Sequence, residues 1–324
     1  MTVKKLLKGE ILIFFLCVVL CVMLILGGGY PQAVLGGISL WVSAIIPSMF
    51  PYFFLSALLS GLNVTGKLSF RLSPLTKRLF NTNGTTGYAL IMSVLSGYPM
   101  GAKIVADLKN GGMLSDAESE RASVFCSTSS PLFLTASVGV SMFNSTAFGL
   151  LLSTVHLLSA VVVGVIFSFY KRKQSAGRMK FFSQAQSQSL FYDSVTSSVN
   201  STLLVGGIIT LFYVFIEILL SNGVLNLPLA LLYKVFGEQS LSSGLVLGLI
   251  EATRGYVALS KGGITFFTLP VACAISGFGG LSVIAQSVAF LKSAKIKTAC
   301  FYLGKILHAV ICFLLGLIFS LFIV

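Results

Sequence analysis

The stretch that decides the fold is Ser96-Gly97-Tyr98-Pro99-Met100-Gly101, which follows the uncharged apolar run Tyr88–Leu95. Proline lacks a donor N–H and glycine tolerates non-helical dihedral angles, so we expect a helix to end here. At membrane depth, non-helical backbone is tolerated only where it is buried in protein or lines a water-filled cavity. The stretch is therefore the strongest candidate in the sequence for a binding or transport site.

The composition indicates a helical protein embedded in a membrane. Of the 324 residues, 56% are hydrophobic and only 10% are charged, and the mean hydropathy is +0.96. Soluble domains carry about 25% charged residues. The apolar runs are long and continuous, which disfavours a membrane β-barrel with its alternating pattern. We predict an all-α polytopic membrane protein with two repeats, broken or re-entrant helices and about 8–10 membrane segments.

The formal charge of +13 does not indicate a nucleic-acid partner. The basic residues gather in short segments between apolar runs, as topology signals do. Three lysines precede the apolar run 11–26, and a second basic group begins a Ser/Gln-rich linker at Lys171. We expect both segments, and hence the N-terminus, to lie in the cytoplasm. The first apolar run is interpreted as an uncleaved transmembrane helix in preference to a cleaved signal peptide.

Changes in composition divide the chain into four parts. These are an N-terminal transmembrane helix (1–32), a first repeat (33–170), a basic cytoplasmic linker (171–190) and a second repeat (191–324). In the first repeat we expect an apolar segment 33–62 broken by Pro47 and Pro51, an amphipathic surface helix near 67–79, a capping box at Ser115–Glu118, a helix break before Pro131 and a span 144–169. In the second we expect segments 199–220, 224–236 and 241–259, a re-entrant segment 264–291 and a last helix 300–324.

The two repeats echo each other at their helix breaks. Ser96-Gly97-Tyr98-Pro99-Met100-Gly101 is matched by Ser276-Gly277-Phe278-Gly279-Gly280, which also follows an apolar lead-in. Paired, interrupted apolar segments in corresponding positions are the best pointer in a sequence to a transporter site. Chance similarity between apolar segments is the alternative.

A helix break frees backbone N–H donors at the start of the second half-helix, and these donors suit a carboxylate or phosphate. Lys103 adds a positive charge near one such terminus, so an anionic solute is the natural inference. The alternative is a purely structural pair of Lys103 with Asp107, one turn on. We predict a substrate-binding set of Ser96, Gly97, Tyr98, Pro99, Gly101, Lys103, Thr128, Ser129, Ser130, Ser276, Gly277 and Gly279, and a coupling or polar set of Glu251, Thr253, Asp107 and Gln286.

Glu251 is the second polar feature, because it follows the apolar run 245–250. Ionisable residues at membrane depth are costly and usually functional, so its carboxylate is a candidate for binding a coupling cation or a proton. The alternative is an ion pair of Glu251 with Arg254. We interpret His156 and His308 as packed, hydrogen-bonded histidines. The six cysteines lack metal-type spacing and are interpreted as small buried apolar residues.

No enzyme signature is present, since the sequence contains no HExxH, GxxxxGK[ST] or GxSxG motif. A serine–histidine hydrolase using Ser129 and His156 can be drawn, but serines at a helix break also satisfy freed backbone groups. We expect neither enzymatic activity nor a cofactor or metal.

The opening stretch, extended to Ala102-Lys103, resembles the hallmark of the nucleoside-recognition Gate-domain membrane proteins. Within these, the chain resembles the sporulation integral membrane proteins of the YlbJ type. Supporting motifs are Gly111-Gly112-Met113-Leu114 with Glu120-Arg121, Ser129-Ser130-Pro131-Leu132-Phe133 and Glu251-Ala252-Thr253-Arg254-Gly255. The resemblance covers the chain from about Gly37 to the C-terminus. It implies two Gate-like halves, related in design to concentrative nucleoside transporters, and for sporulation members movement of dipicolinic acid across a membrane of the developing spore.

These inferences predict a permease for a small anionic solute, plausibly dipicolinate, in the bacterial cell membrane or a forespore membrane. It would work by alternating access between the repeats. Its partners would be the solute, the lipid bilayer and a coupling cation or proton. The alternatives are a nucleoside or other small-metabolite permease, and a non-transporting membrane scaffold for spore assembly.

Overall fold

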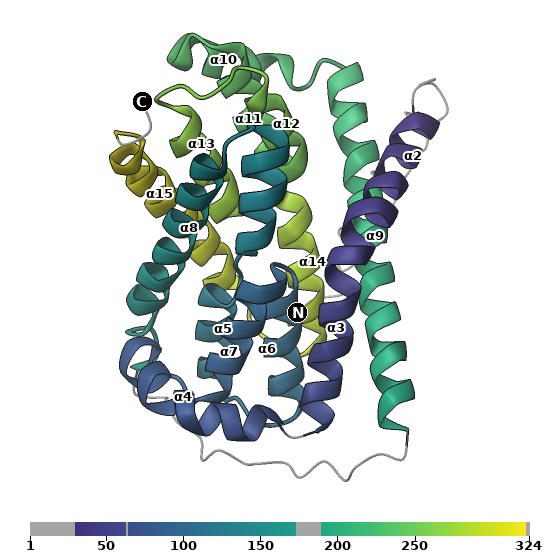
Figure 1. Cartoon of the computed structure of the whole chain (residues 1–324), viewed down its shortest axis with the longest axis vertical. Coiled ribbons are helices and arrows are strands. Elements are labelled where there is room, and N and C mark those ends of the chain that lie inside the picture. The colour runs from purple at the N-terminus through teal and green to yellow at the C-terminus, as the bar shows by residue number, and fades with distance from the viewer. Residues whose placement is uncertain (1–29, 63, 173–188, 322–324) are drawn as a thin grey trace, which may run out of the picture.

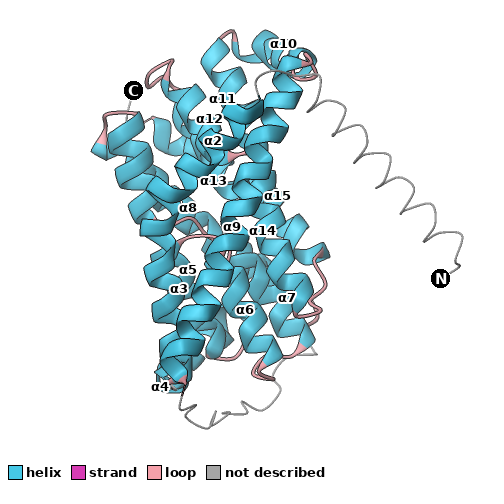
Figure 2. Cartoon of the chain, turned by 90° about the vertical axis from the view of Figure 1, so that its right-hand side faces the viewer, coloured by secondary structure: helices cyan, strands magenta, loops and turns pink. Residues whose placement is uncertain are grey.

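The computed structural model describes residues 30–62, 64–172 and 189–321, and in these ranges all regular structure is helical (Figures 1 and 2). The predicted all-α class is confirmed. The predicted first transmembrane helix and most of the basic linker lie outside the described residues.

Four helical segments are long and apolar enough to cross a membrane: α8 (Thr146–Phe167), α9 (Leu190–Ser221), the 26-residue segment Thr268–Ser293 and α15 (Ala299–Ser320). A helix of 22 residues is about 33 Å long, which matches the hydrocarbon core of about 30 Å. Five shorter apolar helices accompany them in the described part of the chain. The molecule is therefore built from full-length spans together with shorter, interrupted ones.

The first apolar segment forms one nearly continuous column beside α9 (Figure 1). It consists of α2 (Tyr30–Leu40), the π-helix η1 (Trp41–Ile45) and α3 (Ile46–Gly61). The predicted interruption at Pro47 and Pro51 is wrong. The π-turn places the Ile46 N–H on the carbonyl of Trp41, five residues back, just where the helix must admit Pro47, and Pro51 lies inside α3.

Trp41 is at a packed position between the column and α9. Its indole Nε1 donates to the carbonyl of Thr202 at 3.1 Å, and the ring lies against Gly206 on α9. A Cβ at Gly206 would stand 2.4 Å from the ring. The small glycine therefore lets α9 approach the column closely.

The remainder of the first half folds between the two ends of the molecule. Helix α4 (Val64–Phe80) lies across the lower end in Figure 1, and α5 (Thr85–Ser96) and α6 (Met100–Asn110) form a hairpin in the lower half. Helix α7 (Asp116–Phe125) packs on this hairpin, and after a non-helical segment η2 (Phe133–Met142) continues to the upper half, where it packs on α12. The predicted break before Pro131 is confirmed.

The second half has the same order of elements with the ends exchanged. Helix α10 (Asn226–Phe236) lies at the upper end, and α11 (Gln239–Ile250) and α12 (Ala252–Ser260) form a hairpin in the upper half (Figure 1). Helix α13 (Thr268–Phe278) and α14 (Gly280–Ser293) make an interrupted span, and α15 completes the chain. By order, the lower hairpin tip at Tyr98 corresponds to Glu251, and not to Ser276–Gly280 as the sequence echo predicted.

The expected single segment 241–259 is two helices, which corrects the prediction. Glu251 adopts extended dihedral angles between α11 and α12, and its carboxylate accepts the Arg254 N–H at 2.8 Å. The side chain thus caps α12 and compensates for the break. A Glu at the end of an apolar run carries no proline or glycine signal, so the pattern alone did not indicate that the helix ends there.

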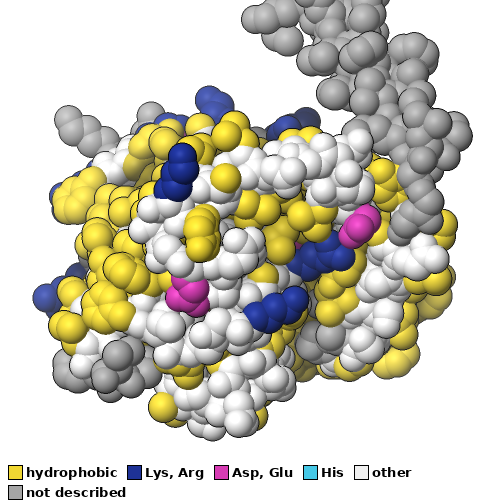
Figure 3. Space-filling view, turned by 90° about the horizontal axis from the view of Figure 1, so that it is seen from above, with side chains coloured by type: hydrophobic (Ala, Val, Ile, Leu, Met, Phe, Trp, Pro, Cys, Tyr) yellow, Lys and Arg dark blue, Asp and Glu magenta, His cyan; other side chains and the backbone are white. Residues whose placement is uncertain are grey.

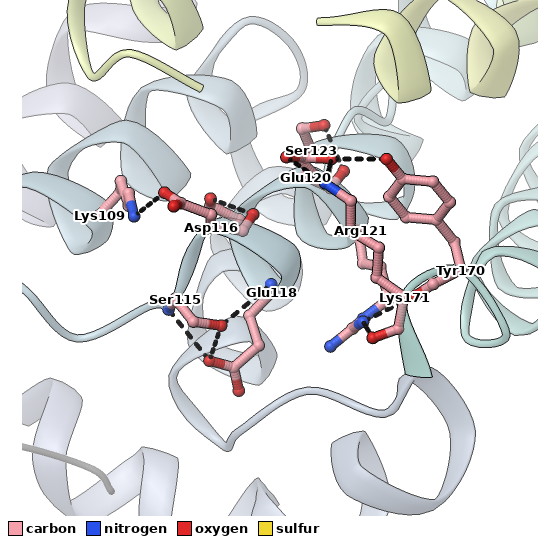
Figure 4. Close-up of polar contacts among 10 residues, drawn as sticks. Lys109, Ser115, Asp116, Glu118, Glu120, Arg121, Ser123, Tyr170 and Lys171 are labelled. Atoms are coloured by element: carbon pink, nitrogen blue, oxygen red, sulfur yellow. Dashed lines mark hydrogen bonds and ion pairs between the residues drawn. The ribbon is translucent and has the colours of Figure 1, made fainter. Parts of the chain in front are cut away.

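A polar network at the start of α7 ties the lower end together (Figure 4). The predicted capping box is confirmed, with Ser115 and Glu118 satisfying each other's backbone. Glu120 accepts from Lys171 at 2.8 Å and from Tyr170 at 2.9 Å, and Arg121 donates to the carbonyl of Tyr170 at 2.8 Å. The network fixes the end of α8, after which the basic linker begins, to the start of α7.

The two ion pairs of this region differ in burial. Lys171 pairs with Glu120, whose side chain is 3% exposed, and the hydrogen bond that Lys171 donates to Glu120 raises the pKa of Lys171. Lys109 pairs with Asp116, whose side chain is 83% exposed, and the hydrogen bond from Lys109 lowers the pKa of Asp116. The carboxylate of the first pair is shielded from water and that of the second is not.

We predict that Glu120→Gln destabilises the fold by about 1–3 kcal/mol, because it leaves polar partners of a buried pair unmatched. Asp116→Asn is the matched control and should change stability by less than about 0.5 kcal/mol, since its pair is exposed. Thermal unfolding of the purified protein in detergent measures both. Equal effects of the two changes would show that burial of the Glu120 pair contributes nothing.

Candidate functional site

The four interruptions of the helices meet in the interior of the molecule. They are the α5–α6 tip at Tyr98, the segment Ser127–Ser130, the α11–α12 tip at Glu251 and the α13–α14 break at Ser276–Gly280. We call Tyr98, Ser127–Ser130, Glu251, Ser276–Gly280 and Lys305 on α15 together the break centre.

Tyr98 links the lower hairpin to the second half of the chain. Its hydroxyl donates to the carbonyl of Ser276 at 3.0 Å, and a Cβ at Gly279 would lie 3.5 Å from the tyrosine ring. The Tyr98–Pro99 peptide bond is cis. Tyr98 thus contacts the stretch Ser276–Gly280 that resembles its own surroundings in sequence. Tyr98 lies at the tip of a helical hairpin, whereas Ser276–Gly280 interrupts a span.

The segment Ser127–Ser130 is held by side chains from other helices. Ser93 on α5 donates to the carbonyl of Cys126 at 2.8 Å and accepts the Thr128 N–H at 3.2 Å. The Ser129 N–H donates to Nε2 of His156 on α8 at 2.8 Å. The backbone groups released by this break therefore have polar partners, as burial at membrane depth requires.

Lys305 is the functional candidate that the sequence reasoning missed. It lies in the middle of an apolar helix, is 2% exposed and donates to the carbonyl of Ser127 at 2.9 Å. Its Nζ also lies 4.8 Å from the centroid of the Tyr98 ring. A single lysine within the run 300–324 was a readable signal, because charges at membrane depth are rare and usually functional.

The backbone on both sides of Glu251 contacts Gly280 of the α13–α14 break. Gly280 has a φ of 81°, and a Cβ there would stand 3.1 Å from the Ala252 N atom and 3.2 Å from the Ile250 carbonyl, so a larger residue would be strained. Glu251 is 6% exposed. The Arg254 guanidinium forms no ion pair with Glu251. It lies 3.8 Å from the Glu217 carboxylate and 4.6 Å from the Tyr213 ring centroid, and both of these residues are on α9.

Lys103 and Asp107 lie on α6 and form an ion pair at 2.8 Å. Both line a cavity of about 460 Å³ between α6, α9 and α14. Gln286, on α14, is buried and donates to Ser282 at 3.2 Å. Thr253 is half-buried in the first turn of α12, beside Glu251.

The other predicted residues lie in the break centre or next to it, where they contact neighbouring backbone and side-chain groups. Ser96 donates to the carbonyl of Met92 at 2.5 Å, and Ser130 accepts the Phe133 N–H at 3.2 Å. Gly97 has a φ of 80° and lies against Ser130, and Gly277 lies against the backbone of His308. Pro99 precedes α6, whose Gly101 lies against the carbonyl of Cys126.

His156 and His308 are packed and hydrogen-bonded, as interpreted from the sequence. His156 accepts from Ser129 through Nε2, so in the neutral ring Nδ1 donates to the Ser276 hydroxyl, 3.2 Å away. His308 donates from Nε2 to the His156 carbonyl at 3.1 Å. Cys312 lies beside both rings, and each nitrogen of His156 already has a protein partner. Cys126, Cys273, Cys300 and Cys312 are buried and free.

Helices α6 and α14 both begin at the break centre, pack against each other and start without a side-chain cap. Their first-turn N–H groups carry the positive end of each helix dipole. Helix α12 differs because Glu251 caps it. The two uncapped termini and the Lys305 ammonium give the break centre the donors and the charge that an anion requires.

Long apolar spans and helices interrupted at a buried polar centre define an integral membrane protein. The chain is 30% identical over 299 residues to the sporulation integral membrane protein YlbJ of Bacillus subtilis strain 168, covering 85% of this chain and 73% of that protein. It therefore belongs to the family of YlbJ sporulation integral membrane proteins. No protein-family model matches the chain and no solved structure matches it. The Gate-domain resemblance thus stays a prediction that rests on the motifs.

We predict that Gly101→Ala prevents normal folding, because its Cβ would stand 1.5 Å from the Cys126 carbonyl oxygen. Overpacking of this kind costs about 1–3 kcal/mol or more. Gly207→Ala on α9 is the matched control, since nothing lies within 4 Å of its added Cβ. Membrane abundance and the apparent melting temperature should fall for the first variant and stay unchanged or rise for the second. Normal abundance of Gly101→Ala would contradict the observed close packing.

Proposed function

We propose that the protein is a permease that moves a small anionic solute through the break centre. The observation that carries this proposal is the buried Lys305 ammonium at the meeting point of the interrupted helices. Among the described residues, no carboxylate lies within 4.0 Å of its Nζ. A buried cation without an ionic partner is costly, and a bound anionic solute would supply that partner.

The two uncapped helix termini support the same solute class. N–H groups at the starts of α6 and α14 would bind the carboxylate oxygens that Lys305 does not reach. Discontinuous helices in transporters point such termini at anionic substrate groups in the same way. Glu251 is proposed as the coupling group, because a buried carboxylate beside the site can take up a cation or a proton as the solute binds.

The internal symmetry of the chain supports alternating access. Leu108-Lys109-Asn110-Gly111-Gly112 after the lower hairpin matches Leu259-Ser260-Lys261-Gly262-Gly263 after the upper one. The last helices share His-x7-Gly-x-Ile-Phe-Ser, at 156–168 and 308–320. Since the two hairpins lie in opposite halves of the molecule (Figure 1), the motifs indicate inverted repeats, between which access to a central site can alternate.

The distribution of charge supports a cytoplasmic lower end. That end carries many basic residues, on α4, in the last turns of α6 and α14, after α8 and between α14 and α15 (Arg71, Lys77, Arg78, Lys109, Lys292, Lys171, Arg172, Lys295 and Lys297). Figure 3 views the upper end, where isolated charged side chains of both signs stand among apolar and uncharged ones. An excess of Lys and Arg marks the cytoplasmic side.

Dipicolinate is the solute that we propose. The YlbJ relative is by its name a sporulation protein, and the resemblance noted in the sequence implies dipicolinic acid for such proteins. Dipicolinate is a small dicarboxylate, so one carboxylate would pair with Lys305 while the other meets the helix termini. The proposed location is accordingly a membrane of the sporulating cell.

We predict that proteoliposomes containing the protein take up labelled dipicolinate and that Lys305→Met lowers this uptake by about 30-fold or more, because losing one partner of a buried charge pair costs about 2–5 kcal/mol. Lys109→Met is the matched control, since Lys109 pairs at the exposed lower end, and it should retain uptake. Equal abundance of the variants in the vesicles is verified first.

Other outcomes of this experiment distinguish the alternatives. Uptake of uridine, with no effect of dipicolinate on it, would favour a nucleoside permease. No uptake of either solute above empty vesicles, under any imposed ion gradient, would contradict transport and favour a membrane scaffold.

A further inference from the structure

The two ends of helix α9 face different surroundings. In its lower third it lines the cavity of about 460 Å³ with Asp193, Ser197 and Asn200, opposite Lys103 and Asp107 on α6. In its upper third it contacts α12, where Glu217 and Tyr213 hold the Arg254 guanidinium. The two regions are 16 residues apart from Ser197 to Tyr213, about 24 Å along the helix.

The lining of the cavity runs from the lower end of α9 to a position on α6 that is close in sequence to Tyr98. Asp193 lies in the first turn of α9, directly after the linker. Lys103 lies in the first turn of α6, five residues after Tyr98. The lining is polar on α9, with hydroxyl and amide side chains on a helix that is otherwise strongly apolar. Such a wall suits water and a solute better than lipid.

The upper contact joins α12 to α9. Arg254 is the third residue of α12, which begins at Glu251 in the break centre. Its guanidinium spans from that helix to α9, between a carboxylate and the face of an aromatic ring. The side chains of Arg254 and Glu217 are 24% and 37% exposed, so the contact lies near the surface and can break without unfolding the core.

We propose that the cavity between α6, α9 and α14 is the cytoplasmic approach to the break centre, and that the Arg254–Glu217–Tyr213 contact closes the opposite approach. The inference rests on the proposed transport function and deepens it. The structure is then the inward-open state, and α9 is the element whose position decides which side is open. In the opposite state, α9 would close on α6 and α14 and release Arg254.

Thiol labelling of single introduced cysteines tests the cytoplasmic approach. Asn200→Cys lines the cavity, whereas Val199→Cys, the next residue on α9, is exposed but does not line it. A charged, membrane-impermeant methanethiosulfonate added to inside-out vesicles should label the first at least about tenfold faster, because reaction requires a hydrated thiolate. Mass spectrometry of the peptide identifies the labelled site in the presence of the native cysteines. Equal rates at the two positions would overturn the proposed approach.

Glu217→Gln in the Asn200→Cys background tests the closing contact. Loss of the ion pair should lower the ratio of inward-open to outward-open protein about two- to fivefold, and the cytoplasmic labelling rate by up to that factor, since a partly exposed pair contributes about 0.4–1 kcal/mol to the inward-open state. Adding Arg254→Gln removes the remaining contact with the Tyr213 ring and should lower the rate further. An unchanged rate in Glu217→Gln would overturn the role of the contact. No solute is used, so this result and the uptake result can fail independently.

Discussion

Every backbone group that a helix break releases at membrane depth must find a partner inside the protein, and this constraint shapes the whole molecule. The partners come from distant parts of the chain: Ser93 for Cys126 and Thr128, His156 for Ser129, and Tyr98 for Ser276. Because each partner is on another helix, satisfying the breaks also assembles the helices. The break centre is thus the structural core as well as the candidate site.

The sequence predicted the features that local chemistry determines. Proline, glycine and clustered hydroxyl residues indicated the breaks at Tyr98, before Pro131 and at Gly279, and the capping box indicated the start of α7. The break at Glu251 was missed because its cause is a side chain that folds back on its own helix start. The continuity through Pro47 was missed because a π-turn can admit a proline that an α-helix rejects.

The site was predicted in part, for a similar reason. Lys103 stood out because it follows the break directly, yet it lies on the wall of the cavity and pairs with Asp107. Lys305 is more than 200 residues further along the chain than Lys103. It lies beside the Tyr98 ring only because α15 crosses the α5–α6 tip in the folded protein. The similar stretches Ser96–Gly101 and Ser276–Gly280 contact each other in the fold but do not occupy corresponding positions in the two halves. The motifs after each hairpin, and those in α8 and α15, do occupy corresponding positions. Proximity through folding cannot be deduced from spacing alone.

The most direct measurement of the central claim is a structure of the protein determined with dipicolinate bound in lipid nanodiscs. The account predicts ligand density in the break centre, with a carboxylate oxygen about 2.7–2.9 Å from the Lys305 Nζ, the usual length of a charge-assisted hydrogen bond. The Ser127 carbonyl would then be released by Lys305. Density confined to the cavity beside Lys103, or an unchanged Lys305–Ser127 bond at saturating ligand, would contradict it.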